Sequence, residues 1–263
     1  MPKVQTNGIF LNYEECGSGE PLILIMGITA DHRVWEVHAD AWSQHFRCIM
    51  PDNRGVGLSD KPAGPYSSAD MADDIAGLMD ALGISSAKVV GCSMGSIITQ
   101  QLALRHPAKV STAVLMCTWA RCDAYAKSVF NHMETIKARL TPPEFMEYIQ
   151  LLIFGKKHWD ENTQDLADGR ADALNQQIPQ PLGGLSGQAH ACRDHDVYDR
   201  LGKISCPCLV IGGENDIFTP RWMSDEVHAA LPNSELFLYP DAGHGFHFEN
   251  LEDFNQRVLD WLK

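Results

Sequence analysis

Two hydrophobic periodicities alternate along the first half of the chain. A continuous apolar run, typical of a strand that is covered on both faces, occurs at 22–26, and further strand-like apolar segments occur at 46–51, 88–91 and 110–117. Between them, apolar residues recur at helical spacing, as in the helix that Ser67 is expected to cap. Before them, Asn7-Gly8 between two short apolar segments predicts an antiparallel hairpin. This rhythm predicts a mostly parallel sheet with helices on both faces.

The rhythm breaks between residues 119 and 195. This stretch carries helical patterns and turns at Pro142-Pro143 and Gly183-Gly184, but no strand-like run. Strand patterns resume at 208–213 and 235–239, and an amphipathic helix ends the chain. We therefore expect an α/β fold with an eight-stranded twisted sheet. Residues 1–118 and 196–263 would form its core, and 119–195 a helical cap inserted after the sixth strand.

Composition narrows the class of partner. The formal net charge of -13 disfavours nucleic acid and anionic membranes as general partners. No apolar run approaches the roughly 20 residues that span a bilayer, and the first residues lack the apolar stretch of a signal peptide. We expect a cytoplasmic protein, with a monomer and a homodimer both left open. Its eight cysteines are expected to be reduced and mostly buried, and Cys206-Pro207-Cys208 makes a poor metal site.

One stretch carries a nucleophile motif. Gly91-Cys92-Ser93-Met94-Gly95 has the G-x-S-x-G pattern and lies between an apolar strand and a helical pattern. Such a strand-to-helix turn lifts the Ser93 hydroxyl off the end of a sheet, and the helix N-terminus favours negative charge beside it. A tight structural turn is the alternative interpretation. Cys92, which precedes the serine, is expected to point away from the cleft.

A serine nucleophile needs a base and a group that orients the base. Asp216 and His244 each follow a predicted strand, and parallel strands end at one edge of a sheet. The order Ser, Asp, His is that of α/β-hydrolases. Asp123 and Glu214 are alternative acids. Two residues close to His244 in the sequence are also considered. Asp241 could be the acid but is expected to form a turn, and His247 could be the base but is expected to face elsewhere.

With these residues in place, the chain resembles the α/β-hydrolase superfamily over almost its whole length. The resemblance is carried by the bend at 52–59, the 91–95 elbow, the Asp216 loop and the Gly243-His244 turn. It is most similar to small esterases and lactonases of the 3-oxoadipate enol-lactonase type, through Gly64-Pro65-Tyr66, Asp194-His195-Asp196 and the Pro207 strand.

The resemblance and the chemistry of acyl transfer together imply an oxyanion hole. The backbone N–H of Met94 and that of Ile28 are the expected donors. In the family a histidine usually precedes Gly27 and braces this loop, whereas this chain has Met26. The loop must therefore be held by other groups. No metal or organic cofactor is required by this mechanism.

The cap and the adjacent core are expected to form an apolar pocket. The candidate lining residues are Trp119, Phe130, Met133, Leu152, Phe154, Trp159, Ile217, Phe218 and Phe246. Each could instead be an ordinary core residue. Arg121, Arg193 and His190 are candidates for binding a substrate carboxylate, with a solvated or salt-bridged surface role as the alternative.

These observations predict a serine hydrolase whose partner is a small-molecule ester or lactone. The same triad could instead cleave a C–C bond in a diketone, or form a peracid as cofactor-free haloperoxidases do. A ligand-sensing receptor on this fold, with slow or single-turnover hydrolysis, is a third interpretation. Dehalogenase and epoxide-hydrolase chemistry is disfavoured, since relatives with those activities carry an aspartate where this chain has Ser93.

Overall fold

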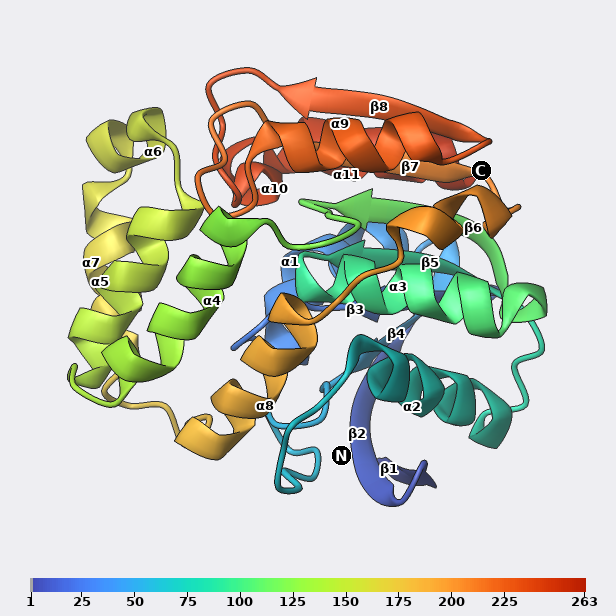
Figure 1. Cartoon of the computed structure of the whole chain (residues 1–263), viewed down its shortest axis with the longest axis horizontal. Helices are drawn as coiled ribbons and strands as arrows, with labels where there is room; N and C mark the ends of the chain where they lie inside the picture. The colour runs from blue at the N-terminus through green and yellow to red at the C-terminus, as the bar shows by residue number, and fades with distance from the viewer. Residues whose placement is uncertain (1) are drawn as a thin grey trace.

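A single eight-stranded sheet forms the centre of the molecule, as the computed structural model of residues 2–263 shows (Figure 1). The strand order is β1-β2-β4-β3-β5-β6-β7-β8. The strands are β1 (Lys3–Thr6), β2 (Ile9–Cys16), β3 (Glu20–Ile25), β4 (Phe46–Pro51), β5 (Ala87–Cys92), β6 (Val110–Met116), β7 (Cys208–Gly213) and β8 (Ser234–Tyr239). β2 pairs antiparallel with β1 and with β4, and all other pairs are parallel. The predicted fold class and the Asn7-Gly8 hairpin are therefore confirmed.

Two apolar layers enclose the sheet. One lies between the sheet and α2 (Ser68–Ala81), α3 (Met94–Arg105) and α9 (Arg221–Ala230). The other lies under α1 (Glu36–Trp42) and α11 (Leu251–Leu262). Along β3, Ile23 and Ile25 enter the first layer, whereas Leu22 and Leu24 enter the second. This alternation explains the continuous apolar runs, because both faces of each central strand are covered.

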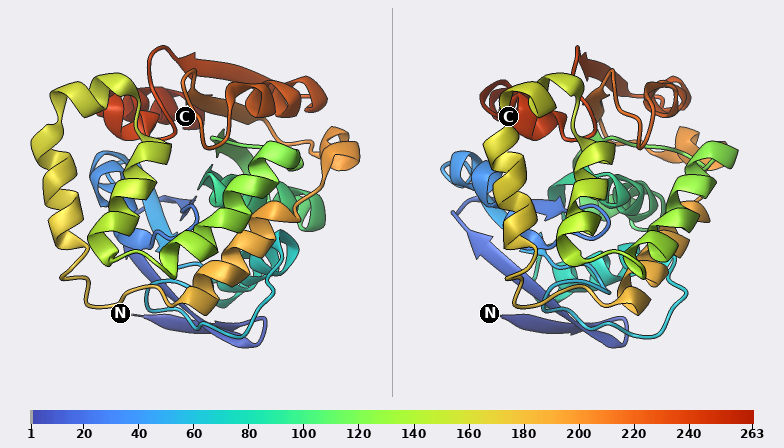
Figure 2. Two further views of the ribbon diagram at one scale, coloured as in Figure 1. Left: turned by 60° about the vertical axis from the view of Figure 1, so that its left-hand side comes forward. Right: turned by 90° about the vertical axis from the view of Figure 1, so that its left-hand side faces the viewer.

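The inserted helices follow β6 and stand at the carboxyl edge of the sheet, toward which the arrowheads of β6 and β8 point (Figure 1). They are α4 (Ala124–Lys137), α5 (Pro142–Ile153), α6 (Lys156–Glu161), α7 (Thr163–Asp172) and α8 (Leu182–Arg193). Figure 2 shows the same helices from the side on which they project. The remaining helices are the short α10 (Phe246–Glu249) and the 3-10 turns η1 (His32–Trp35), η2 (Pro107–Lys109) and η3 (Tyr198–Lys203). The cap boundaries at 119 and 195 remain a prediction.

After β3 the chain passes through a loop into a short helical segment. It starts as the 3-10 turn η1, and the α-helix α1 ends at Trp42. The Asp31 carboxylate caps this turn by accepting a hydrogen bond from the Arg33 backbone N–H at 3.1 Å. The cap fixes the chain reversal that leads away from the carboxyl edge of the sheet.

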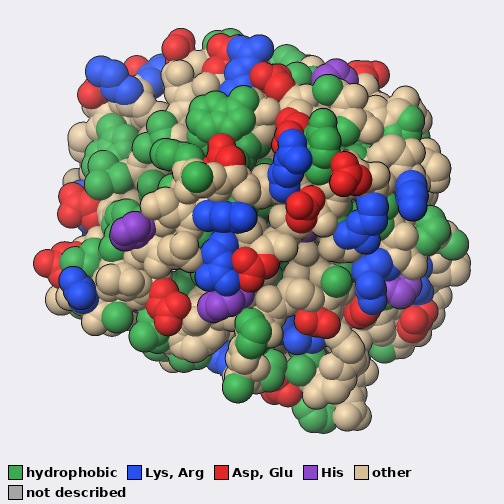
Figure 3. Space-filling view, viewed as in Figure 1, with side chains coloured by type: hydrophobic (Ala, Val, Ile, Leu, Met, Phe, Trp, Pro, Cys, Tyr) green, Lys and Arg blue, Asp and Glu red, His purple; other side chains and the backbone are tan. Residues whose placement is uncertain are grey.

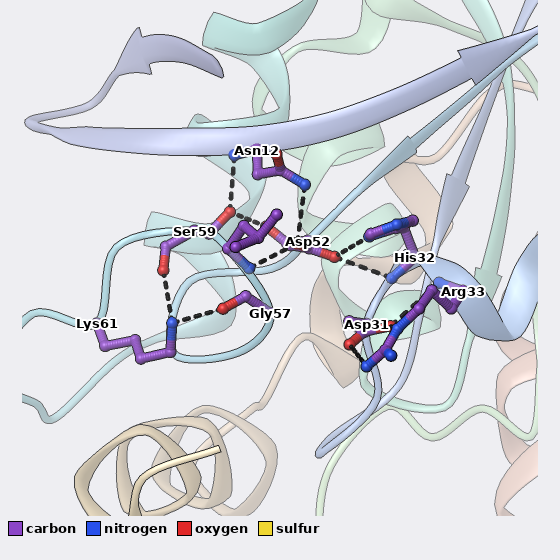
Figure 4. A network of polar contacts seen from close by, with 9 residues as sticks. Asn12, Asp31, His32, Arg33, Asp52, Gly57, Ser59 and Lys61 are labelled. Atoms are coloured by element: carbon purple, nitrogen blue, oxygen red, sulfur yellow. Dashed lines mark hydrogen bonds and ion pairs between the residues drawn. The ribbon is translucent and has the colours of Figure 1, made fainter. Parts of the chain in front are cut away.

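A buried carboxylate, Asp52, fixes the position of this turn (Figure 4). One of its oxygens accepts hydrogen bonds from the backbone N–H and the Nδ1 of His32, at 2.9 and 2.7 Å. The other accepts from Asn12 Nδ2 at 2.9 Å and from the Leu58 N–H at 2.8 Å. The hydrogen bond to Asp52 raises the pKa of His32, which favours the imidazolium. Three chain segments are thus tied to one buried charge.

Charged side chains of both signs are interspersed over the face drawn in Figure 3, while hydrophobic side chains gather at its upper left. Three exposed apolar residues, Tyr125, Ile217 and Trp222, lie where α4 meets the start of α9, with the Tyr125 hydroxyl donating to the Ile217 carbonyl at 2.6 Å. Within residues 2–263, no helix combines the length and the apolar character that crossing a bilayer demands.

Alanine substitutions at two neighbouring glycines of α8 test how closely that helix packs against the core. A Cβ on Gly184 would lie 2.2 Å from the Gly55 carbonyl oxygen, whereas one on Gly183 would meet nothing within 4 Å. Gly184→Ala should therefore lower the free energy of unfolding by about 1–3 kcal/mol. Gly183→Ala should raise it by about 0.5–1 kcal/mol. Urea denaturation of both variants checks this, and equal effects would contradict the described packing.

Candidate active site

Ser93 stands at a strained turn between β5 and α3. Its backbone has φ 54° and ψ -116°, a conformation that residues other than glycine rarely adopt. The glycines on either side permit the turn: a Cβ on Gly91 would lie 2.3 Å from the Gly95 carbonyl oxygen, and one on Gly95 would lie 2.0 Å from that of Ile25. Only hydrogen atoms fit at these positions. The sequence motif therefore forms the expected elbow at the carboxyl end of β5.

Asp216 and His244 meet at the ends of β7 and β8. His244 Nδ1 lies 2.7 Å from Asp216 Oδ2. The other carboxylate oxygen accepts from the backbone N–H groups of Phe218 and Thr219 at 2.8 and 2.9 Å. Because the carboxylate accepts, Nδ1 carries the proton and Nε2 of the neutral ring is left free as a base.

Asp216 raises the pKa of His244. Burial alone would lower it, but the negative charge of Asp216 and the hydrogen bond to it act in the opposite direction and prevail. Thr219 adds a hydroxyl that lies 3.0 Å from Asp216 Oδ2 and 3.1 Å from His244 Nδ1. Thr219 was not predicted from the sequence, although a threonine three residues after the acid is the signal that could have indicated it.

The competing acids have other partners. Asp123 caps α4 by accepting from the Ala126 N–H at 2.8 Å. Glu214 pairs with Arg221 at 3.1 Å on the surface. Asp241 forms a turn with φ 59°. Asp216 is therefore the acid that the fold brings to His244.

Ser93 and His244 line the same cavity, and the serine hydroxyl is buried. Among the described residues, Ser93 Oγ has no hydrogen-bond partner. The hydroxyl is therefore not hydrogen-bonded to the imidazole of His244. In apo enzymes such contacts are often long, and they tighten when substrate binds.

Two backbone N–H groups stand beside Ser93. Met94 is the first residue of α3, so its N–H lies at the positive end of the helix. Ile28 lines the cavity in the loop after β3, and Gly27 passes so close that an added Cβ would be 3.2 Å from the Ser93 Cβ. Within residues 2–263, neither N–H donates a hydrogen bond to another residue. Both groups are free to bind an oxygen atom.

The cavity has a volume of about 490 Å³ and is mostly apolar. Besides Ser93 and His244, the residues that line it are Met26, Gly27, Ile28, Thr29, Ala30, Asp31, Arg33, Val34, Val37, Cys92, Met133, Met146, Ile149, Ile153, Gln176, Phe218, Gly245, His247 and Phe248. Its one pair of opposite charges is Asp31 with Arg33, whose guanidinium donates to that carboxylate at 2.7 and 2.9 Å. Cys92, which was expected to point away from the cleft, is among these residues and is also buried in the apolar layer under α1 and α11.

Of the apolar residues predicted to contact substrate, Met133 and Phe218 line the cavity and the other seven do not. Leu152 shows why. The residues of α5 that face the cavity are Met146, Ile149 and Ile153, which are spaced three and four apart along one side of the helix. Leu152 lies on the adjacent side and packs against the core.

The remaining six predicted lining residues lie outside the cavity because they pack elsewhere in the fold or lie on its surface. Trp119 and Phe130 are fully buried and pack on each other with ring centroids 5.5 Å apart. Phe246 is enclosed by aromatic rings in the other apolar layer. Phe154 stacks on His158 at 4.0 Å, and Trp159 lies half-buried on α6. Ile217 is 52 % exposed on the surface.

The candidate carboxylate-binding residues also lie outside the cavity. Arg121 pairs with Glu226 at 2.9 Å, and Arg193 with Asp194 at 2.7 Å. His190 Nδ1 bonds to the Ser186 carbonyl at 2.8 Å. The positions of all three fit the surface interpretation.

His247 was expected to face away, yet it lines the cavity beside His244. His247 lies in the short helix α10, which begins two residues after His244. His247 Nδ1 lies 2.9 Å from His38 Nε2, and His38 Nδ1 lies 2.6 Å from Asn255 Oδ1. Burial lowers the pKa of His38 to about 3, so that ring is neutral.

Two groups of potential metal ligands occur among the described residues. One is Cys117 with Asp216 and His244, and the other is Asp31 with His32 and Asp52. In each group a histidine and a carboxylate already bond to each other at 2.7 Å. These contacts are hydrogen bonds between the imidazole and the carboxylate of each pair.

The family to which the chain belongs follows from comparison with known proteins. The family model for the alpha/beta hydrolase fold matches residues 20–251, so the chain belongs to that family. It is 35% identical to a Mycobacterium tuberculosis protein named provisionally as the non-heme bromoperoxidase BpoC, over 97% of this chain and 98% of the relative. A Caulobacter protein named provisionally as the carbamate hydrolase RutD is 31% identical, over 92% of this chain and 90% of the relative.

Among solved structures, the enol-lactonase of Burkholderia xenovorans LB400 is similar with a TM-score of 0.89 and 26% identity, over 99% of both chains. The predicted resemblance to the α/β-hydrolases, and within them to the esterase and lactonase types, is confirmed. The chain is a hydrolase-class enzyme of this family.

The geometry predicts an imidazole that stays protonated to a higher pH than an ordinary histidine. Folded-state titration of His244 by NMR should give a pKa above 6.5. Asp216→Asn removes the carboxylate but leaves the burial, so the pKa of His244 should fall below 6.5 in that variant. An unchanged pKa would show that the carboxylate is not the cause.

Proposed function

We propose that this protein is a serine hydrolase that cleaves carboxylic esters or lactones through an acyl-enzyme. The observation that carries the proposal is that His244, which is hydrogen-bonded to Asp216, lines the same cavity as Ser93. In this proposal Ser93 is the nucleophile, His244 the general base and acid, and Asp216 the residue that orients the imidazole.

The proposed reaction has two halves. Ser93 Oγ attacks the carbonyl carbon while His244 Nε2 takes its proton, and Asp216 stabilises the imidazolium. The N–H groups of Ile28 and Met94 bind the oxyanion. The proton on His244 then passes to the leaving alcohol. Water, deprotonated by His244, attacks the acyl-enzyme, which releases the acid and restores Ser93.

The cavity indicates a neutral, largely apolar substrate. Its lining is aliphatic and aromatic, and the charges of Asp31 and Arg33 cancel each other. A free carboxylate on the substrate would find no unpaired cation among the described lining residues. Substrates of about this cavity's size with an uncharged acyl group are therefore favoured. A cytoplasmic location and a monomeric or homodimeric state stay predictions from the sequence.

Ser93→Ala should abolish ester turnover while leaving the fold intact. Loss of a serine nucleophile costs at least about a thousandfold in kcat, because the remaining groups cannot form the acyl-enzyme. Initial rates with p-nitrophenyl acetate and butyrate measure the effect, with Ser186→Ala on α8 as a matched control. Wild-type rates in Ser93→Ala would contradict the assignment.

The same assay separates an enzyme from a ligand-sensing receptor. Many turnovers per molecule support the enzyme, and a single burst per molecule supports the receptor. A panel of short esters, long esters, lactones and carbamates then ranks the substrates by kcat/KM.

Peracid formation is a second candidate, favoured by the similarity to the protein named as a bromoperoxidase. In it, hydrogen peroxide replaces water in the attack on the acyl-enzyme, so the products are a peracid and free Ser93. With an acetate ester and hydrogen peroxide, the peracetate formed would oxidise bromide. Oxidation that disappears in Ser93→Ala supports this candidate, and oxidation that persists rules out the acyl-enzyme as its source.

A further inference from the structure

The loop that carries Ile28 is held by side chains from two distant parts of the chain. On one side of Ile28, the Met26 carbonyl accepts a hydrogen bond from Asn53 Nδ2 at 2.8 Å. On the other side, the Thr29 N–H donates to Gln188 Oε1 at 3.1 Å. The Met26 side chain offers no donor of its own. The peptide groups on either side of the Gly27–Ile28 peptide, which carries the Ile28 N–H, are thus clamped by Asn53 and Gln188.

The orientation of the Gln188 amide is fixed by partners with fixed roles. Its Nε2 donates to the Arg54 carbonyl at 2.9 Å, and a carbonyl can only accept. Its Oε1 faces the Thr29 N–H and also accepts from Gln180 Nε2 at 2.8 Å. Gln180 Nε2 also lies 3.2 Å from the Gly55 carbonyl. If the Gln188 amide were flipped, its NH₂ group would face the Thr29 N–H and Gln180 Nε2, which are donors, and its oxygen would face the Arg54 carbonyl. Only one orientation therefore satisfies this buried network.

Packing holds Gln188 in place. The side chain is fully buried, and α8 approaches the bend at 54–55 so closely that Gly184 has no room for a Cβ. Helix α8 lies in the segment inserted between β6 and β7, 159 residues from Thr29. A residue of the insertion therefore reaches the loop beside the nucleophile.

The clamp holds a strained conformation. Thr29 has φ 71°, in the left-handed region that a β-branched residue rarely adopts. Without the bond from its N–H, the Thr29 backbone would relax toward ordinary values and would turn the preceding peptide groups. The Ile28 N–H would then point away from the position of the oxyanion.

We propose that Gln188 and Asn53 are positioning residues, which aim the Ile28 N–H at the oxyanion by clamping the loop on both sides of it. This inference rests on the proposed hydrolase function. It assigns the inserted helix α8 a part in transition-state binding.

The test uses Gln188→Met, which keeps the length of the side chain and removes its hydrogen bonds. Loss of one oxyanion donor lowers kcat by about a hundred- to a thousandfold, and a misaimed donor should cost about ten- to a hundredfold. The KM for p-nitrophenyl butyrate should stay within about twofold, because the clamp acts on the transition state. Affinity for an aryl boronic acid, which mimics the tetrahedral intermediate, should fall in parallel with kcat.

Two further variants separate positioning from folding. Leu185→Ala, on the same buried side of α8, should lower the melting temperature without changing kcat. Asn53→Ala tests the clamp from the other side of Ile28 and should repeat the loss in kcat, even if Gln188→Met does not fold. Amide hydrogen exchange supplies a readout independent of activity: the Thr29 N–H should be protected in the wild type and exchange faster in Gln188→Met.

The outcomes distinguish this inference from the proposed function. Wild-type kcat in both clamp variants, or Thr29 protection that does not change in Gln188→Met, would overturn the clamp while leaving the hydrolase intact. Ester turnover that persists in Ser93→Ala would overturn the proposed function, and the exchange measurement would still decide whether Gln188 holds the loop.

Discussion

The close approach of backbone segments around Ser93 is the constraint on which the site depends. Gly91 and Gly95 each bring another chain segment to a distance at which a methyl group would collide, and at Gly27 a Cβ would lie only 3.2 Å from the Ser93 Cβ. This packing holds Ser93 at a positive φ, which an isolated turn would not keep. The strain fixes the hydroxyl, the start of α3 and the loop after β3 relative to one another, so the cavity forms at that point.

Buried polar side chains tie the surrounding loops to this centre. Asp52 joins β2, η1 and the bend that follows β4, while Asp216 joins its own loop to His244. Gln188 joins the inserted helix to the loop after β3. A buried group that loses its partner costs about 1–3 kcal/mol, so each tie is strongly favoured over partial opening. The apolar layers stabilise the sheet, and these few polar ties set the geometry at its edge.

The parts of this arrangement that depend on local signals could be predicted from the sequence. The strands, the elbow at Ser93 and the placement of Asp216 and His244 after strands follow from periodicity and from the geometry of parallel sheets. Beyond Met133 and Phe218, the cavity lining could not be predicted, because the phase of a helix decides it: Met146 and Ile149 face inward while Leu152 does not. The contact between Gln188 and Thr29 had no signal, since nothing local links residues so far apart in the sequence.

The proposed mechanism requires that one hydroxyl in the chain be made reactive by its place in the fold. Reaction with a fluorophosphonate, followed by mass spectrometry of the digested protein, identifies that hydroxyl. We expect one adduct per chain, on the peptide that contains Ser93, and a much slower reaction in His244→Ala. An unmodified protein, or an adduct on another residue, would contradict it.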